Sequence, residues 1–208
     1  MRLLQLIQRG LANFIASAYH NWGETYNERG QHQDALRVCE RALALNARDC
    51  HAHYQRGIAY VGLRQIDRAL LEFNKALELA DSAWQVVEIH IWRGLALYHA
   101  ADYPDAISEF NLALHLQKTH SMVYVYRGMA EQGQGNLSAA QADFTQAIRH
   151  DQANFIAYRH RGDVYAKRNN IRQAIADYRA YLTLSGGHNA RQAEIVRQEI
   201  TELSRRTA

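Results

Sequence analysis

The sequence predicts an all-α protein in which one helix–turn–helix repeat is stacked several times as an α-solenoid. The first observation is an Arg-Gly pair that returns as Arg56-Gly57, Arg93-Gly94, Arg127-Gly128 and Arg161-Gly162, with Trp22-Gly23 in the same place once more. Successive glycines are separated by 34, 37, 34 and 34 residues, and a fixed period in this range indicates a repeat architecture. The second observation is composition. The 208 residues contain one proline and no long run of Val, Ile or Thr, which favours helices over strands.

The period divides most of the chain into repeats, with a helical extension at each end. Five repeats are expected, at about residues 16–49, 50–83, 87–120, 121–154 and 155–188, between an N-terminal segment, 1–15, and a C-terminal segment, 189–208. Stacked repeats bury a continuous core, and about three are enough for stability. Repeats and extensions together fill all 208 residues, so no length remains for a separate catalytic domain.

Each repeat has a glycine on its first helix, and four of the five have a residue between two alanines on the second helix. A glycine inside a helix costs roughly 1 kcal/mol relative to alanine. Its return at one register therefore indicates that close helix packing needs the missing Cβ. The ring between the alanines is expected to fill the adjoining space and to supply much of the buried apolar area. The residues at this position are, in chain order, Cys39, Phe73, Phe110, Phe144 and Tyr178.

This combination of period, glycine and alanine-flanked ring resembles the tetratricopeptide repeat family over about residues 16–188. The resemblance implies a right-handed superhelix. It also implies that the first helix of each repeat lines a concave groove, which receives an extended peptide or a helix from another protein.

Several positions depart from the family pattern. The proline that often closes a repeat is absent, and its positions hold Ala47, Asp81, Lys118, Gln152 and His188. We therefore expect Asp49, Ser121 and Asn154 to cap the helices that follow. Three extra residues at 84–86 are expected to lengthen either the first helix of the third repeat or its loop. Tyr181 replaces the second alanine of the fifth repeat, which predicts altered or looser packing there.

Both extensions carry amphipathic patterns. In residues 2–15 an apolar stripe predicts a helix that runs into, or caps, the first repeat helix; it consists of Leu3, Ile7, Leu11 and Phe14. Three roles stay open for it: a shield for the open end of the core, a surface for dimerisation or docking, and a weak anchor at a membrane surface. The C-terminal helix is expected at 190–205 as a solvating cap or, in the alternative, as a partner-binding helix, and its stripe consists of Ala193, Val196, Ile200 and Leu203.

Residues that could carry chemistry lack the spacing that chemistry needs. Cys39 and Cys50 do not make a disulfide framework. The two rings of His51-Ala-His53 would lie about 200° apart on a helix, so they cannot share a metal ion. Gly133-Gln-Gly135 falls at a helix–helix turn without the strand that precedes a phosphate-binding loop. We therefore predict no enzyme activity, no catalytic residue, no metal and no cofactor.

Charge and hydropathy exclude other classes. A net charge of +3 over 208 residues does not imply nucleic-acid binding. No run approaches the 18 or so apolar residues of a membrane span. Gln5, Gln8 and Arg9 interrupt any signal-peptide core. These observations predict a cytoplasmic protein without an integral membrane segment.

The family resemblance places an apolar and aromatic set of residues in the groove: Tyr54, Ile58, Trp92, Leu95, Met122, Val125, Tyr126, Met129 and Arg159. One subgroup of the family clamps a terminal carboxylate, but the matching positions here include Glu24 and Glu88, which would repel it. We predict a scaffold that binds a peptide or helix of another protein without such a clamp. Alternatively, these side chains do not contact a ligand and instead pack against neighbouring repeats. The alternative function is a self-associating protein, a homodimer formed through the N-terminal helix.

The recurring arginine allows two interpretations. Arg56, Arg93, Arg127 and Arg161 could form a basic ladder for an acidic ligand. Alternatively, each could join a carboxylate or the last carbonyls of a neighbouring helix and hold the helices in register. The position beside the packing glycine favours the structural bridge.

Overall fold

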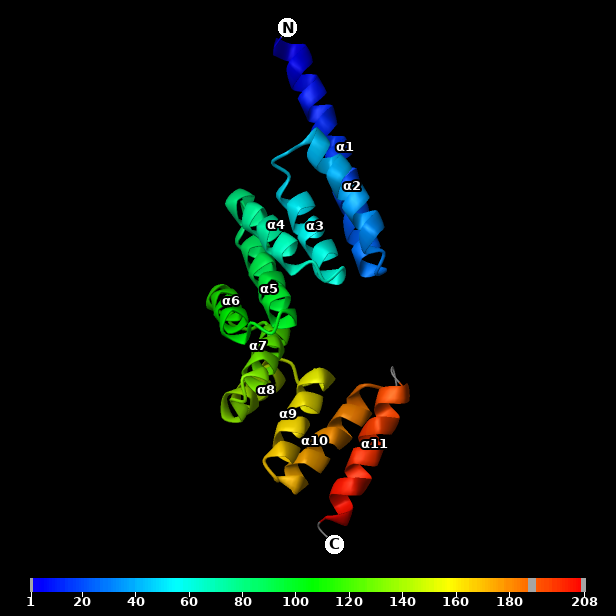
Figure 1. Ribbon diagram of the computed structural model, residues 1–208, viewed down its shortest axis with the longest axis vertical. Helices are drawn as coiled ribbons and strands as arrows, with labels where there is room; N and C mark the ends of the chain where they lie inside the picture. Colours follow the sequence, from blue (N-terminus) through cyan, green and yellow to red (C-terminus); the bar gives the residue numbers. More distant parts are fainter. Residues whose placement is uncertain (1, 187–189, 207–208) are drawn as a thin grey trace. The chain divides into compact units, whose positions relative to one another are not determined.

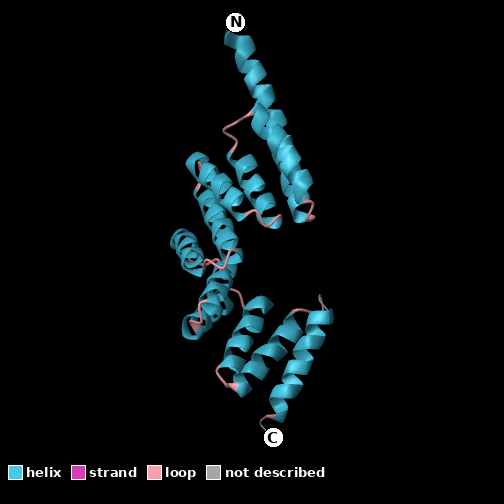
Figure 2. Ribbon diagram, in the orientation of Figure 1, coloured by secondary structure: helices cyan, strands magenta, loops and turns pink. Residues whose placement is uncertain are grey.

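The structure, a computed structural model, describes residues 2–186 and 190–206, and this part of the chain consists of helices joined by turns (Figures 1 and 2). It confirms the all-α helical-repeat class. The chain divides into two compact units, Met1–Asp102 and Tyr103–Ala208. The first contains α1 (Arg2–Glu28), α2 (His32–Leu45), α3 (Cys50–Gly62), α4 (Ile66–Leu79) and α5 (Ala83–His99). The second contains α6 (Tyr103–Leu116), α7 (Ser121–Gly133), α8 (Leu137–His150), α9 (Phe155–Lys167), α10 (Ile171–Leu184) and α11 (Ala190–Arg205).

Glycine and ring meet where helices pair, as the sequence predicts. The pairs α1–α2, α3–α4, α7–α8 and α9–α10 pack against each other. A Cβ added to Gly57 would lie 2.5 Å from Cε1 of Phe73, and one added to Gly162 would lie 2.5 Å from Cε1 of Tyr178. Carbon atoms do not approach so closely, because their favourable separation is about 3.5–4.0 Å. The missing Cβ is therefore a condition of the observed helix spacing.

Two of the three predicted helix caps are confirmed. Asp49 accepts a hydrogen bond from the backbone N–H of Ala52 at 3.0 Å, at the start of α3. Asn154 caps α9 through the N–H of Ala157 at 3.1 Å. Ser121 was expected to cap α7, and that prediction is wrong. It is the first residue inside the helix, and its hydroxyl donates to the carbonyl of Ala147 at 2.9 Å, which joins α7 to α8.

The extra residues at 84–86 lengthen a helix rather than a loop. Helix α5 spans 17 residues, against 13 in α3. Ser82 caps it, accepting from the N–H of Gln85 at 3.3 Å. Trp84 consequently stands in the first turn of α5, and 59% of its surface is exposed.

The N-terminal stripe does not shield the core. Helix α1 is continuous over Arg2–Glu28, so the segment runs directly into the first repeat helix, as expected. In Figure 1 its first turns (blue) extend beyond α2. Ile7, Leu11 and Phe14 are 60%, 59% and 75% exposed, whereas a shield would be buried. The side chain of Leu3 lies outside the described residues.

The C-terminal stripe is buried. Helix α11 packs on α10, and Val196 and Leu203 are 0% and 6% exposed. Tyr181 lies in the same apolar cluster and its ring centroid is 6.0 Å from that of Phe155. The substitution of alanine by tyrosine therefore alters the packing without loosening it. His188, at a position where the family pattern has proline, lies outside the described residues.

We expect Gly57→Ala to destabilise the fold by about 1–3 kcal/mol, because an overpacked contact must displace Phe73 or α3. Gly10→Ala in α1 is the matched control, since a Cβ there would meet nothing within 4 Å. That substitution should be neutral or stabilising by up to about 1 kcal/mol. Urea unfolding of both variants measures the difference, and equal stabilities would contradict the account.

Candidate functional site

A pocket of about 230 Å³ lies in the first unit, between side chains of α1, α3 and α5. The residues that line it are Glu24, Asn27, Glu28, His51, Tyr54, Gln55, Ile58, Trp84, Glu88 and Trp92. All belong to the first helix of a repeat, the face that the family resemblance assigns to the groove. The pocket lies on this face and is the candidate site.

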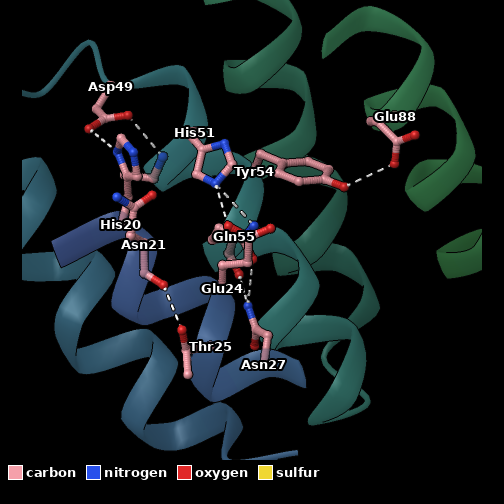
Figure 3. Close-up of polar contacts among 11 residues, drawn as sticks. His20, Asn21, Glu24, Thr25, Asn27, Asp49, His51, Tyr54, Gln55 and Glu88 are labelled. Carbon is pink, nitrogen blue, oxygen red and sulfur yellow. Dashed lines mark hydrogen bonds and ion pairs between the residues drawn. The ribbon is translucent and has the colours of Figure 1, made fainter. Parts of the chain in front are cut away.

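Hydrogen bonds between α1 and α3 hold the polar side of the pocket (Figure 3). The side-chain amide of Asn27 donates to the backbone carbonyl of Gln55 at 2.8 Å and to its Oε1 at 3.0 Å. Gln55 is 3% exposed and its Nε2 lies 3.2 Å from Nε2 of His51. At the far end, Nδ1 of His20 donates to Asp49 at 2.8 Å. Burial opposes ionisation of Asp49, but the hydrogen bonds from His20 and Ala52 hold its pKa below the ordinary value.

The opposite side of the pocket is aromatic. Tyr54 is only 8% exposed, and its hydroxyl donates to Glu88 of α5 at 3.4 Å (Figure 3). Burial, reinforced by the Glu88 carboxylate, raises the pKa of Tyr54 well above its usual value, so the hydroxyl remains a donor. Trp84 and Trp92, about two turns apart on α5, add two indole rings.

The pocket carries negative charge. Three carboxylates line it, and among its described lining residues none is Lys or Arg. His51 lies 3.7 Å from Glu24, yet burial and the neighbouring His20 lower its pKa. His51 is therefore neutral near pH 7 and does not balance the glutamates. This arrangement disfavours a carboxylate ligand, in agreement with the sequence-based argument from Glu24 and Glu88.

The structure brings three of the predicted groove residues together, since Tyr54, Ile58 and Trp92 all line the pocket. Ile58 is 8% exposed, so only a small part of its side chain is accessible to a ligand. Leu95 lies further along α5, is half-buried and is not part of the lining.

The other predicted groove residues lie in the second unit. Met122 and Met129 are half-buried and pack against the core around Phe144. The ring of Tyr126 is half-buried and lies 5.9 Å from that of Phe110.

Two predicted residues are not available to a ligand in the way the sequence suggested. Val125 is 0% exposed and belongs to the core of α7–α9, because the helical register turns its side chain inward. Arg159 is bound by both oxygens of Glu199 on α11, with the longer contact at 2.9 Å. It also lies 3.1 Å from Asp163. The C-terminal helix therefore occupies the guanidinium.

Trp84 and Glu28 were missed as site residues. Trp84 belongs to the extra residues between repeats and so had no family position to carry over. The signal was a large aromatic residue within an insertion at the start of a first helix. Glu28 lies one turn after Glu24 on α1, a spacing that places both on one helical face.

The recurring arginines are bridges. Arg127 of α7 binds both oxygens of Asp143 on α8, at 2.9 and 2.5 Å, and also donates to Asn111 of α6 at 2.6 Å. Arg161 binds Asp177 at 2.7 and 2.9 Å. Both aspartates are 6% exposed. The hydrogen bonds that Arg127 donates to Asp143 raise the pKa of Arg127, so this bidentate pair is fixed within the repeat rather than offered to a ligand.

Arg56 makes the corresponding contact in the first unit. Its Nη2 donates to Glu72 of α4 at 2.7 Å, and His53 contacts the same carboxylate at 2.8 Å. Burial would raise the pKa of Glu72, but these two hydrogen bonds hold it below the usual value. His53 is thus a buried residue whose ring joins α3 to α4.

Metal-ligating and thiol groups of the described residues can be assessed directly. Within residues 2–186 and 190–206, no group of three or more His, Cys, Asp or Glu could hold a metal ion. Burial raises the pKa of the Cys39 thiol to about 12 and that of Cys50 to about 11, so neither is an activated nucleophile. Over the same residues, no helix combines the length and the apolar character that crossing a membrane requires.

Fold and pocket together define a helical-repeat protein with an open, aromatic and acidic pocket on the first helices of its first unit. The model of the tetratricopeptide repeat family matches residues 20–83, 54–120 and 127–189. The chain belongs to the tetratricopeptide repeat family. The number of five repeats stays a prediction.

Solved structures with the same fold are similar at low identity. PilF of Pseudomonas aeruginosa is 19% identical with a TM-score of 0.72, covering 94% of this chain and 93% of PilF. MamA (41-end) of Desulfovibrio magneticus RS-1 is 20% identical, with a TM-score of 0.68. The match covers 84% of this chain and 97% of that MamA chain. YrrB, described as a TPR protein with an unusual peptide-binding site, is 21% identical, with a TM-score of 0.61. The match covers 82% of this chain and 86% of YrrB. A comparison with curated proteins finds no match.

Arg127→Ala should lower the free energy of unfolding by about 2 kcal/mol or more, because it leaves Asp143 buried without its partner. Asp143→Asn alone should cost less, and the double variant should show that the two effects are not additive. Chemical denaturation of the four proteins in this cycle measures the coupling. Unchanged stability of Arg127→Ala would restore the basic-ladder interpretation.

His160 should make stability depend on pH. Its ring stacks on Phe144 with centroids 5.5 Å apart, and burial, with a smaller effect of Arg159, lowers its pKa from 6.5 to about 4. Between these values the unfolded chain binds a proton that the folded chain does not. The free energy of unfolding therefore falls as pH decreases through this window, by up to about 1.4 kcal/mol per pH unit from this group.

His160→Phe keeps a ring against Phe144 and removes the titration. Unfolding of the wild type and of this variant at about pH 7 and about pH 5 should show a smaller loss for the variant. An equal loss in both proteins would mean that His160 does not control the acid sensitivity.

Proposed function

We propose that the protein is a non-catalytic interaction module that binds a peptide or helix of another protein on the surface formed by its first helices. The pocket between α1, α3 and α5 is the principal anchor site. The observation that carries this proposal is the gathering of Tyr54, Trp84 and Trp92 in one open cavity. Aromatic side chains are enriched among the residues that dominate binding energies, and solenoids use extended concave faces for binding.

Other features support the same function. The site of YrrB is described as peptide-binding, and that protein shares this fold. In the second unit, half-buried Met122, Tyr126 and Met129 are proposed as secondary contacts, since methionine adapts to irregular partners. No terminal-carboxylate clamp forms part of the proposal. A cytoplasmic location and the absence of a nucleic-acid partner stay predictions.

The test is selection of linear peptides from a random phage-displayed library on the immobilised protein. Trp84→Ala should weaken binding of the selected peptides at least about fivefold, a typical cost of removing an interface aromatic. Leu71→Ala is the matched control, because Leu71 on α4 is 64% exposed and Trp84 is 59% exposed. Peptides whose affinity is unaffected by Trp84→Ala and Trp92→Leu would contradict the proposed site.

The second candidate function is self-association through α1. It is favoured by the exposure of Ile7, Leu11 and Phe14 on the turns that extend beyond α2. Contiguous exposed apolar surface of this kind commonly marks a protein interface.

Sedimentation velocity distinguishes this candidate. If α1 mediates a dimer, Leu11→Gln/Phe14→Gln should convert it to a monomer, whereas Leu71→Gln should not. A wild-type protein that sediments as a monomer at all tested concentrations would remove this function.

A further inference from the structure

We propose that the pocket of the first unit binds the cationic side chain of a lysine or arginine in the partner segment. This inference rests on the proposed function and adds the chemical class of residue that the pocket selects. It commits to a basic protein segment as the occupant, on the ground of charge complementarity within a built cavity.

Three carboxylates make the pocket attractive to a cation. Glu24 and Glu28 come from α1 and Glu88 from α5, so negative charge enters the cavity from two different helices. Tyr54 donates to Glu88, which holds that carboxylate in place without neutralising it. His51 is uncharged near pH 7 because burial lowers its pKa. No described lining residue contributes a positive charge.

The aromatic rings are a second source of attraction for a cation. Trp84, Trp92 and Tyr54 share the cavity with the carboxylates. A cation within about 6 Å of an aromatic face is attracted by the ring, most strongly by tryptophan. The long methylene stem of lysine or arginine packs along apolar surface while its head stays polar. A basic side chain therefore satisfies both walls at once.

Other occupants fit less well. A carboxylate or phosphate would meet three glutamates and no cation. A purely apolar side chain would cover the rings but would remove carboxylates from water without a compensating partner, which is costly.

The experiment uses the peptides selected from the phage-displayed library. Lys or Arg should be enriched at one position, and its replacement by norleucine, which keeps an apolar stem without the charge, should weaken binding about tenfold by fluorescence anisotropy. Raising the salt concentration should reduce this difference. In Glu24→Gln/Glu28→Gln/Glu88→Gln, which removes all three carboxylates, the preference for Lys over norleucine should shrink to the part that the rings supply. Glu40→Gln, an exposed change on α2 outside the cavity, should preserve the preference.

Circular dichroism first establishes that the variants are folded, so that a change in peptide binding reports on the pocket. Peptides that depend on Trp84 but bind equally with Lys and norleucine overturn this inference and leave the proposed function intact. A preference for Lys that is undiminished in Glu24→Gln/Glu28→Gln/Glu88→Gln also overturns it, because the charge would then be recognised outside this pocket. A library that yields no binding peptide contradicts the proposed function and this inference with it.

Discussion

The contact between a glycine on one helix and an aromatic ring on its partner sets the spacing on which the rest of the structure depends. At Gly57 and Gly162 the backbone of a first helix lies so close to the ring of Phe73 or Tyr178 that a Cβ would not fit. The arginine beside each glycine then reaches a carboxylate 16 residues later, as in Arg56–Glu72 and Arg161–Asp177. Close packing and a charged bridge therefore fix the same helix pair from adjacent positions.

This arrangement assigns the two sides of each first helix to different tasks. The side that carries glycine and arginine is committed to the second helix, whereas the remaining side is free to vary. In the first unit that free side supplies Glu24 from α1, Tyr54 from α3, and Glu88 and Trp92 from α5. Hydrogen bonds between Asn27 and Gln55 hold α1 against α3, so the pocket stands on a fixed framework.

The fold was accessible from the sequence because the same physical requirement is written into it at a regular interval. One glycine is weak evidence, but its return beside the same arginine indicates packing.

The site was less accessible because it depends on residues that do not repeat. Trp84 lies in an insertion, and its position followed only from the extension of α5. Val125 shows the opposite error, since a varying residue was assigned to the surface although the helix turns it into the core. The stripe of α1 could not be assigned either, because amphipathicity alone does not say what covers it.

The central claim is that the repeated residues build the fold and that a partner segment is held in the pocket of the first unit. The chain contains three tryptophans, of which Trp84 and Trp92 line the pocket, while Trp22 on α1 is 54% exposed and is not part of the lining. Titration of the ¹⁵N-labelled protein with a selected peptide, followed through the three indole N–H signals, tests this claim most directly. The account predicts that the signals of Trp84 and Trp92 shift together and that the signal of Trp22 stays in place. A shift of Trp22 alone, or of none of the three with a peptide that binds, would contradict it.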